Sequence, residues 1–457
     1  MNIKGKFKLS STQIVMLGFV ALILVGSLLL MCPFSSASGK STDYLTALFT
    51  STTSVSVTGL VVVDTFSHWS LVGKIIILLL IQLGGFGVVT VYSLVLLALN
   101  KKFSLKDRVL IQDYYDLDSM GGLIRFLTKV VKGTFLIEGI GMVLYLPVFI
   151  KDFGFVKGIW VSLFTAISAF CNAGIDIIGA DSLIPYRTNV LINCVTMFLI
   201  IMGGLGFIVW FDVMNTIKYC KEKKIGYRKI WSRLGEHSRL VIVLTMLLIL
   251  VGTVFTLIFE FDNPDTIGDL NWGKKVMVSL FQSVTFRTAG FASVPQGALT
   301  PLTALMGLLF MFIGGSPVGT AGGVKTVTMF ILMLNVVSFV RQRDEAVVFN
   351  RSVSHELINK ATAVVTVSLS FTLMFLGLLV ATNDVSVLDA SYEIFSATAT
   401  VGLSRGITAS LNNAGRIIMI CAMYLGRIGP ISMTLFFTTK PSKKNKVNYA
   451  EGHFKVG

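Results

Sequence analysis

Charged side chains are scarce in this chain. Asp, Glu, Lys and Arg together make up 14% of its 457 residues, whereas soluble domains carry about 25%. Hydrophobic residues account for 54%, and the mean hydropathy is +0.78. This composition argues against an ordinary soluble domain and predicts an integral membrane protein.

Cysteine and histidine are also scarce, with five and four copies. The cysteines are scattered and form no CxxC pair, so we expect neither a disulfide framework nor a metal cluster. The net charge of +15 is one standard sign of nucleic-acid binding. Here, however, the basic residues are divided among short loops between apolar runs, and we expect no nucleic-acid partner.

The N-terminal apolar run allows two interpretations. Lys4, Lys6 and Lys8 precede it, and Ser35-Ser36-Ala37 could be the cleavage site of a signal peptide. At about 20 residues, the run 12–32 is long for a signal peptide and suits a membrane span. The repeat described next also needs a first helix there, so we favour the span.

One glycine recurs four times in a similar setting. Gly59, Gly174, Gly290 and Gly402 are separated by 115, 116 and 112 residues, and a second glycine landmark follows each by 25, 29, 24 and 24 residues. Self-similarity at a fixed period marks a repeated structural unit. Four units are therefore expected around a shared axis, with backbone rather than side chains facing that axis.

Each unit contains a long apolar run, a short mixed stretch, the glycine motif and a second long run. The short stretch cannot cross a hydrocarbon core of ~30 Å, so it is predicted to dip into the membrane and return. The predicted fold class is an all-α integral membrane protein, with four pseudo-symmetric repeats of helix, re-entrant pore helix with filter loop, and helix, giving eight spans around a central pore. The predicted segments are an N-terminal tail (1–12), units one (13–100), two (125–217), three (238–340, with an intramembrane loop at 314–325) and four (357–438), and a C-terminal tail (439–457).

The distribution of charge predicts the orientation. Basic residues gather in the N-terminal tail, between units two and three at 218–239, and in the C-terminal tail, whereas the connections within units lean acidic, as at 260–269. By the positive-inside rule, both termini are cytoplasmic and the short helices enter from outside. We expect a multi-pass protein of the plasma membrane.

The recurring glycines predict an ion filter. A cation entering a membrane needs oxygens in place of water, and rings of backbone carbonyls provide them in potassium-selective filters. Glycine accepts positive φ and places no Cβ in the pore. Close helix packing would explain a single glycine, but four at near-equal spacing favour the filter. The predicted ion-binding residues are Val57, Thr58, Gly59, Asn172, Ala173, Gly174, Thr288, Ala289, Gly290, Thr400, Val401 and Gly402.

Unit three departs from the other units in its second run, 302–340, which Pro317 and several glycines interrupt. Such a stretch cannot stay helical, so an irregular loop beneath the filter is predicted to act as a gate, with a simple kink as the alternative. Arg427 is predicted to reach the pore or this loop, with binding to helix-end carbonyls as the alternative. The predicted gate residues are Gly314, Gly315, Ser316, Pro317, Gly319, Thr320, Gly322, Gly323, Lys325 and Arg427.

Three further expectations concern buried groups. Arg287, just before a filter turn, is expected to pair with an acidic group. Glu138, inside the first span of unit two, is expected to form a buried pair with an unknown partner. The glycines of the second spans in units one and two, within residues 84–87 and 203–206, are expected to be packing glycines, since both groups lie inside apolar runs.

Together these motifs resemble the Trk/Ktr/HKT superfamily of potassium transporters, and in particular the membrane subunits of bacterial Ktr systems. The resemblance covers essentially the whole chain, although Cys171, Ile175 and Phe286 depart from the residues common there. It implies a homodimer in the bacterial cell membrane, each protomer with its own pore, and a cytoplasmic ring of RCK regulatory subunits (KtrA-like). ATP or ADP would act only through that ring, and no cofactor would be covalently bound.

The predicted function is that of a channel-like, potassium-translocating pore subunit of a K⁺ uptake system, and not of an enzyme. The loop would gate the pore under control of the RCK ring, and a dependence on Na⁺ stays open. The alternatives are a Na⁺/K⁺ secondary transporter with alternating access and a non-transporting membrane scaffold. Parallel repeats favour a pore, because many transporters use inverted repeats.

Overall fold

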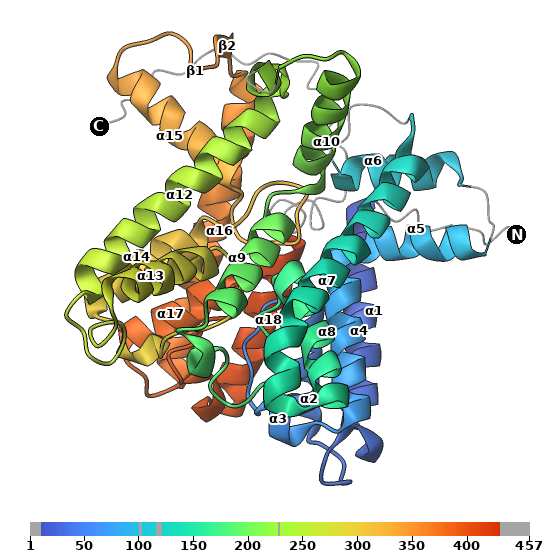
Figure 1. Cartoon of the computed structure of the whole chain (residues 1–457), viewed down its shortest axis with the longest axis vertical. Coiled ribbons are helices and arrows are strands. Elements are labelled where there is room, and N and C mark those ends of the chain that lie inside the picture. Colours follow the sequence, from blue (N-terminus) through green and yellow to red (C-terminus); the bar gives the residue numbers. More distant parts are fainter. Residues whose placement is uncertain (1–10, 100–102, 116–120, 227–228, 430–457) are drawn as a thin grey trace, which may run out of the picture.

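The computed structural model describes residues 11–99, 103–115, 121–226 and 229–429. Most of the described chain is helical (Figure 1). Most of the predicted N-terminal tail, and all of the predicted C-terminal tail, lie outside the described residues.

The first two units have the same order of elements. Unit one contains α1 (Ser11–Met31), η1 (Pro33–Ser35), α2 (Tyr44–Ser56), α3 (Thr65–His68), α4 (Leu71–Phe86) and α5 (Val88–Ala98). Helix α6 (Leu105–Tyr115) follows it. Unit two contains α7 (Leu123–Phe153), α8 (Phe155–Cys171), η2 (Ile184–Tyr186), α9 (Val190–Gly204) and α10 (Phe207–Glu222).

The last two units follow the same plan. After α11 (Ile230–Arg233), unit three contains α12 (Glu236–Glu260), α13 (Trp272–Phe286), η4 (Gln296–Ala298), α14 (Pro301–Phe312) and α15 (Thr326–Val340). A short antiparallel hairpin of β1 (Val347–Val348) and β2 (Arg351–Ser352) leads to unit four. Unit four contains α16 (His355–Thr382), α17 (Val387–Thr398), η5 (Thr408–Ser410) and α18 (Asn413–Ile428).

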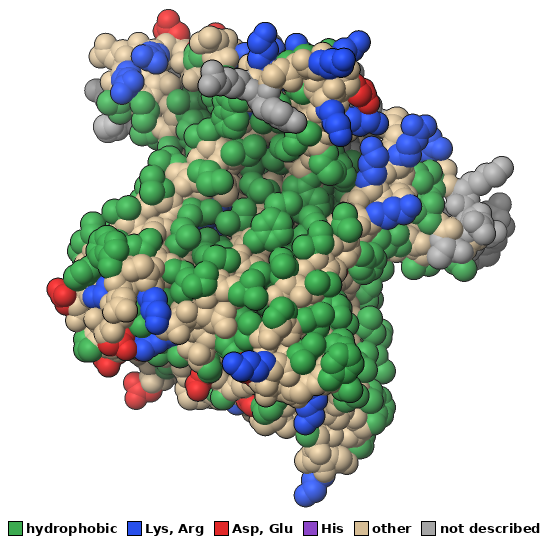
Figure 2. All heavy atoms as spheres, viewed as in Figure 1, with side chains coloured by type: hydrophobic (Ala, Val, Ile, Leu, Met, Phe, Trp, Pro, Cys, Tyr) green, Lys and Arg blue, Asp and Glu red, His purple; other side chains and the backbone are tan. Residues whose placement is uncertain are grey.

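Long apolar helices open every unit. Helices α1, α7, α12 and α16 are each long and apolar enough to cross a membrane, and so are the bent pairs α4–α5 and α9–α10. Hydrophobic side chains cover the middle of the face in Figure 2, with Lys and Arg gathered near the top. The all-α membrane fold is confirmed.

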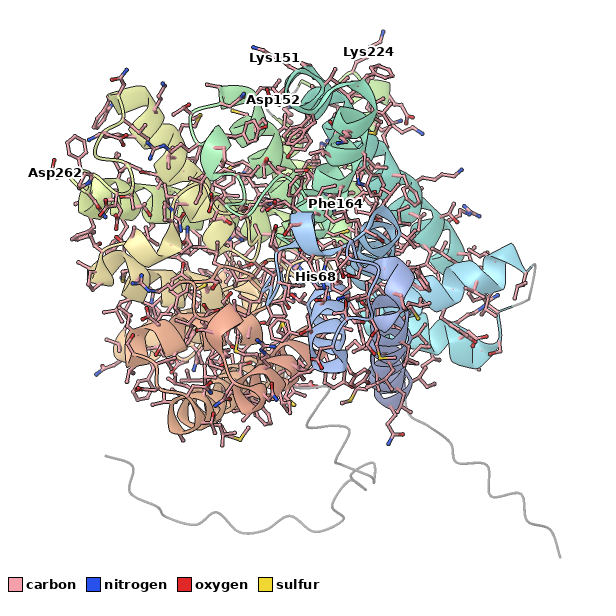
Figure 3. All side chains as sticks on the ribbon, turned by 90° about the horizontal axis from the view of Figure 1, so that it is seen from below. His68, Lys151, Asp152, Phe164, Lys224 and Asp262 are labelled. Carbon is pink, nitrogen blue, oxygen red and sulfur yellow. The ribbon has the colours of Figure 1, made fainter. Side chains whose placement is uncertain are left out.

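The shorter helices α2, α8, α13 and α17 are buried between the spans. Figure 3 shows the four units around the centre in chain order. Burial of the polar α2 is possible because its hydroxyls are satisfied locally. Those of Thr50, Ser54 and Ser56 each donate to the carbonyl four residues back, and Asp43 caps the helix by accepting from two backbone N–H groups.

The second spans of units one and two are bent, whereas the sequence analysis found an interruption only in unit three. Both α4–α5 and α9–α10 turn by 98°, at Gly87 and Gly206. These glycines have φ values of 76° and 89°, which a residue with a side chain rarely adopts. The interruption of unit three is therefore an enlarged form of a break that units one and two also have.

Gly84 and Gly203, in the second spans of units one and two, do pack closely, as expected. A Cβ at Gly84 would collide with the Val55 carbonyl oxygen, and one at Gly203 with the Phe170 carbonyl oxygen. Both carbonyls lie in the last turn of a pore helix. The missing side chains therefore let each second span lie directly against the helix end that leads into a glycine loop.

Candidate functional site: a four-loop constriction and an intramembrane loop

The four short helices end with the same unusual backbone. The residue two positions before each recurring glycine is left-handed, with φ of 56° at Val57, 60° at Asn172, 63° at Thr288 and 51° at Thr400. Left-handed Val and Thr are rare and strained, and such strain is concentrated at functional sites.

The recurring glycines themselves also have positive φ. The values are 107° at Gly59, 63° at Gly174, 81° at Gly290 and 94° at Gly402. Glycine is therefore required here for its backbone conformation. The four loops share positive φ at these two positions, although only their glycines are identical.

The four glycines form a closed ring. A Cβ built on each would lie within 2.8 Å of the carbonyl oxygen of the residue that precedes the glycine of the next unit. Gly59 meets Ala173, and Gly402 closes the ring by meeting Thr58. In the same way, Gly174 meets Ala289 and Gly290 meets Val401. The structure thus brings the predicted filter residues of all four units together at one constriction.

Hydroxyl groups of the pore helices hold each loop. Thr53 accepts a hydrogen bond from the Gly59 N–H at 2.9 Å, and Ser396 accepts one from the Gly402 N–H at 3.0 Å. In units two and three the hydroxyl is the donor instead. Ser168 bonds to the Ile175 carbonyl at 2.5 Å and Thr285 to the Phe291 carbonyl at 2.6 Å.

The polar side chains of the four glycine loops either bond to groups nearby in the structure or have no partner among the described residues. The Thr58 hydroxyl lies 2.7 Å from that of Ser56. In the orientation that satisfies it, the Asn172 amide donates to Ala169 and Ile200 carbonyls. The Thr288 hydroxyl is buried without a partner among the described residues. Arg287 forms no ion pair within the described chain, so its expected acidic partner is not found there.

A cavity of about 510 Å³ opens onto the constriction, and all four recurring glycines line it. We call this side of the ring the outer side and the opposite side the inner side. Asp64 and Asp176 also line this cavity. Desolvation of the Asp176 carboxyl raises its pKa to about 6. When ionised, the carboxylates of Asp64 and Asp176 would place negative charge in this cavity, and that charge would favour cations there.

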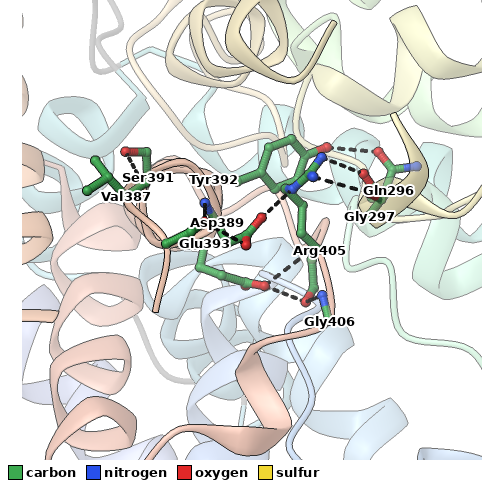
Figure 4. A network of polar contacts seen from close by, with 11 residues as sticks. Gln296, Gly297, Val387, Asp389, Ser391, Tyr392, Glu393, Arg405 and Gly406 are labelled. Carbon is green, nitrogen blue, oxygen red and sulfur yellow. Dashed lines mark hydrogen bonds and ion pairs between the residues drawn. The ribbon is translucent and has the colours of Figure 1, made fainter. Parts of the chain in front are cut away.

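An arginine network fastens unit four to unit three at the outer side (Figure 4). Arg405 pairs with Asp389 at 2.6 Å and donates to the carbonyls of Gln296 at 2.9 Å and Gly297 at 3.1 Å. The buried Glu393 carboxyl accepts from the Arg405 N–H at 3.1 Å. The sequence analysis missed this network. The sequence signal that could have pointed to it is Glu393, a carboxylate within the short pore helix α17.

The loop of unit three docks against unit two on the inner side. The Ser316 N–H donates to the Gly204 carbonyl at 2.9 Å, and the Thr320 N–H to the Gly203 carbonyl at 3.1 Å. The Thr320 hydroxyl reaches the Phe170 carbonyl at 3.1 Å. Both side chains are fully buried. The loop is therefore a folded plug held by backbone hydrogen bonds.

The same loop lies directly beneath the glycine ring. A Cβ at Gly322 would collide with the Thr400 hydroxyl, and it would lie 2.8 Å from the Ala399 carbonyl oxygen. Gly322 also lines an inner cavity of about 570 Å³, together with Pro317, Lys325 and Arg427. None of the four ring glycines lines this cavity. The loop therefore separates the ring from the inner cavity.

Arg427 joins the loop to unit one. Its guanidinium donates to the Thr320 carbonyl at 2.6 Å and to the Gly84 carbonyl at 2.5 Å. The two roles considered for this residue, contact with the loop and binding of a helix-end carbonyl, are thus combined. Lys325 bonds within the loop, to the Ala321 carbonyl at 2.6 Å.

Four parallel units around one glycine ring, with an outer and an inner cavity, define a membrane pore protein. The family model described as "TrkH: Cation transport protein" matches residues 8–447. The chain belongs to this family, whose members are cation transport proteins rather than enzymes.

Individual relatives cover nearly the same length. The chain is 36% identical to the potassium/sodium uptake protein NtpJ of Enterococcus hirae, over 98% of this chain and 96% of the relative. It is 35% identical to the Ktr system potassium uptake protein B of Bacillus subtilis, over 97% and 96%. The solved potassium transporter TrkH of Vibrio parahaemolyticus superposes with a TM-score of 0.74 at 17% identity, covering 96% of this chain and 87% of that one, which shows the shared fold.

Proposed function

We propose that this chain is the potassium-translocating pore subunit of a K⁺ uptake system. The closed glycine ring carries the proposal, because four backbone loops of one conformation can surround a dehydrated cation with equivalent carbonyl oxygens. The names of the relatives NtpJ and Ktr protein B, which refer to potassium or sodium uptake, support K⁺ as the cargo.

The filter would consist of the twelve residues predicted from the sequence, and the loop 314–325 would be its gate. The loop fills the space between the ring and the inner cavity, so an ion could pass only when it moves. Arg427 would hold the closed loop and add a positive charge to the barrier.

Assembly and orientation belong to the same proposal. We infer a homodimer with both termini in the cytoplasm, regulated there by a ring of nucleotide-binding RCK subunits. The concentration of basic side chains toward one end supports that end as the cytoplasmic face (Figure 2). A dependence on Na⁺ would appear in the uptake experiment described next.

Uptake by a host that lacks its own K⁺ uptake systems tests the function. Expression of the chain with its RCK partner should restore growth at low K⁺, measured with and without Na⁺, while Gly174→Ser should not. A folded, membrane-inserted chain that transports no K⁺ under either condition would refute the proposal.

A further inference from the structure

In each unit, a side-chain hydrogen bond near the middle of the first span ties the pore helix to that span. In units one and three a serine donates to a backbone carbonyl: Ser51 to Ile23 at 2.7 Å and Ser283 to Ile249 at 2.8 Å. In unit four the tie joins two hydroxyls, Thr372 and Thr398, at 3.1 Å. Three of the four ties therefore use neutral groups.

Unit two is different because its tie uses a carboxyl group. The Cys171 thiol donates to Glu138 Oε1 at 3.9 Å, joining α8 to α7. Glu138 is only 2% exposed, and it forms no ion pair in the described part of the chain. Burying a carboxyl without a cation costs free energy that an apolar residue would avoid. Helix packing alone does not explain a glutamate here.

The surroundings of this carboxyl are polar but incompletely bonded. Gln82 of α4 faces Glu138, although its geometry falls short of a full hydrogen bond. Thr134 lies one turn earlier on α7, and its hydroxyl is buried without a partner in the described chain. The second carboxyl oxygen of Glu138 is likewise unbonded. A group of polar side chains therefore meets behind the unit-two loop.

Cys171 is held from two sides. Glu138 lies on one side, and on the other a Cβ at Gly85 would come within 2.5 Å of the Cys171 sulfur. The next residue is Asn172, the left-handed residue that opens the unit-two loop. Any shift of Cys171 must therefore move the backbone of Asn172. The neighbour of Gly85, Gly84, accepts the hydrogen bond from Arg427, so the same corner also contacts the inner barrier.

We infer that Glu138 is a positioning residue for ion selectivity, acting through Cys171 to hold the unit-two loop at the radius that fits the transported cation. This inference rests on the proposed function of the glycine ring. Glu138 does not touch the ion. Its carboxyl oxygen sets where α8 ends, and thereby where the loop carbonyls lie.

The test compares four variants in proteoliposomes, measuring the apparent KM for K⁺ and the competition by Na⁺. Glu138→Leu and Cys171→Ala should each lower the preference for K⁺ over Na⁺ by roughly fivefold, the effect of losing one hydrogen bond of ~1 kcal/mol. The double variant should be no worse than either single one, because both remove the same contact. Glu138→Gln retains an acceptor oxygen and should keep the preference within about twofold.

Two controls make the outcome decisive. Tyr145→Phe removes another buried α7 hydrogen bond, to Thr196 at 2.6 Å, away from the loop, and should leave selectivity unchanged. Gly174→Ser tests the ring itself. If Gly174→Ser abolishes K⁺ preference while Cys171→Ala and Glu138→Leu leave it intact, the positioning role is wrong and the filter stands. If Gly174→Ser changes nothing, the filter proposal fails first. Should Glu138→Leu not fold, Cys171→Ala and the Gln variant decide alone, and an unchanged preference in Cys171→Ala overturns the inference.

Discussion

The outer and inner sides of the constriction are built on different plans. The outer side is nearly four-fold symmetric: each unit contributes one left-handed residue, one glycine with positive φ and one hydroxyl that holds the loop. The inner side is asymmetric, with one loop from unit three and one arginine from unit four. On the proposed function, ion choice would depend on equivalent backbone groups, whereas control of flux would depend on an added plug.

The largest expected effect comes from breaking the symmetry. In Gly402→Ala, the added Cβ would collide with the Thr58 carbonyl oxygen, and the backbone would be forced to keep a φ of 94° with a side chain present. We expect K⁺ preference over Na⁺ to fall by at least ~10-fold, consistent with a strain of roughly 1–3 kcal/mol. Uptake of K⁺ with Na⁺ as competitor measures it.

The matched control is Gly377→Ala in α16. This glycine has open space around it and no positive φ, so the change should leave uptake and selectivity as they are. Equal losses in Gly377→Ala and Gly402→Ala would show a general intolerance of unit four rather than a role of the ring.

The second prediction concerns the inner side. Arg427→Ala removes the two hydrogen bonds that join the loop to unit one, and it also removes a half-buried positive charge. K⁺ flux without the regulatory subunits should rise several-fold, and shortening the loop within residues 316–322 should act in the same direction. Selectivity should stay near that of the parent chain, because the glycine ring is untouched.

Flux through reconstituted vesicles, with Na⁺ competition measured in the same preparation, separates the two sides. A folded loop deletion that conducts no faster than the parent would disprove the gate. Arg427→Lys is the informative intermediate, since an ammonium keeps the charge but lacks the planar fork that reaches two carbonyls at once. If Arg427→Lys keeps K⁺ flux as low as in the parent chain, the positive charge rather than the two-carbonyl geometry closes the pore.

The third prediction uses two ion pairs on the outer side. Arg405→Gln breaks the pair with Asp389, whose two side chains are 11% and 29% exposed, and should cost ~3 kcal/mol of stability. Arg187→Gln breaks the more exposed pair with Asp269, at 28% and 51%, and should cost less than ~1 kcal/mol. Thermal unfolding in detergent compares them. If Arg405→Gln lowered the melting temperature less than Arg187→Gln, the network in Figure 4 would not hold units three and four together.

The symmetric side was also the part that the sequence could predict. The intervals between Gly59, Gly174, Gly290 and Gly402 are visible in the chain, and glycine is itself a conformational signal. The 98° bends at Gly87 and Gly206 were missed because hydrophobic residues continue through them, and hydropathy does not record direction.

Contacts between distant segments could not be derived in the same way. Arg405 binds the Gln296 carbonyl 109 positions away, and Arg427 binds Gly84 across 343 positions. Neither contact belongs to a repeating pattern in the sequence that could have revealed it. Glu138 could be singled out as a buried charge, but its partner Cys171 became evident only from the packing of α7 against α8.

The smallest expected effect tests whether the four loops are held independently. Thr53→Val and Ser396→Ala each remove one hydroxyl acceptor from a ring glycine N–H, at 2.9 and 3.0 Å. Each should cost ~1 kcal/mol and change the K⁺ preference by no more than about fivefold. Because Gly402 packs against Gly59, the two loops share a contact, and the double variant should lose more than the sum of the single changes. Strict additivity in a double-mutant cycle, measured by Na⁺ competition, would instead show four loops that hold the ion separately, and the closed ring would then be a feature of packing rather than of selectivity.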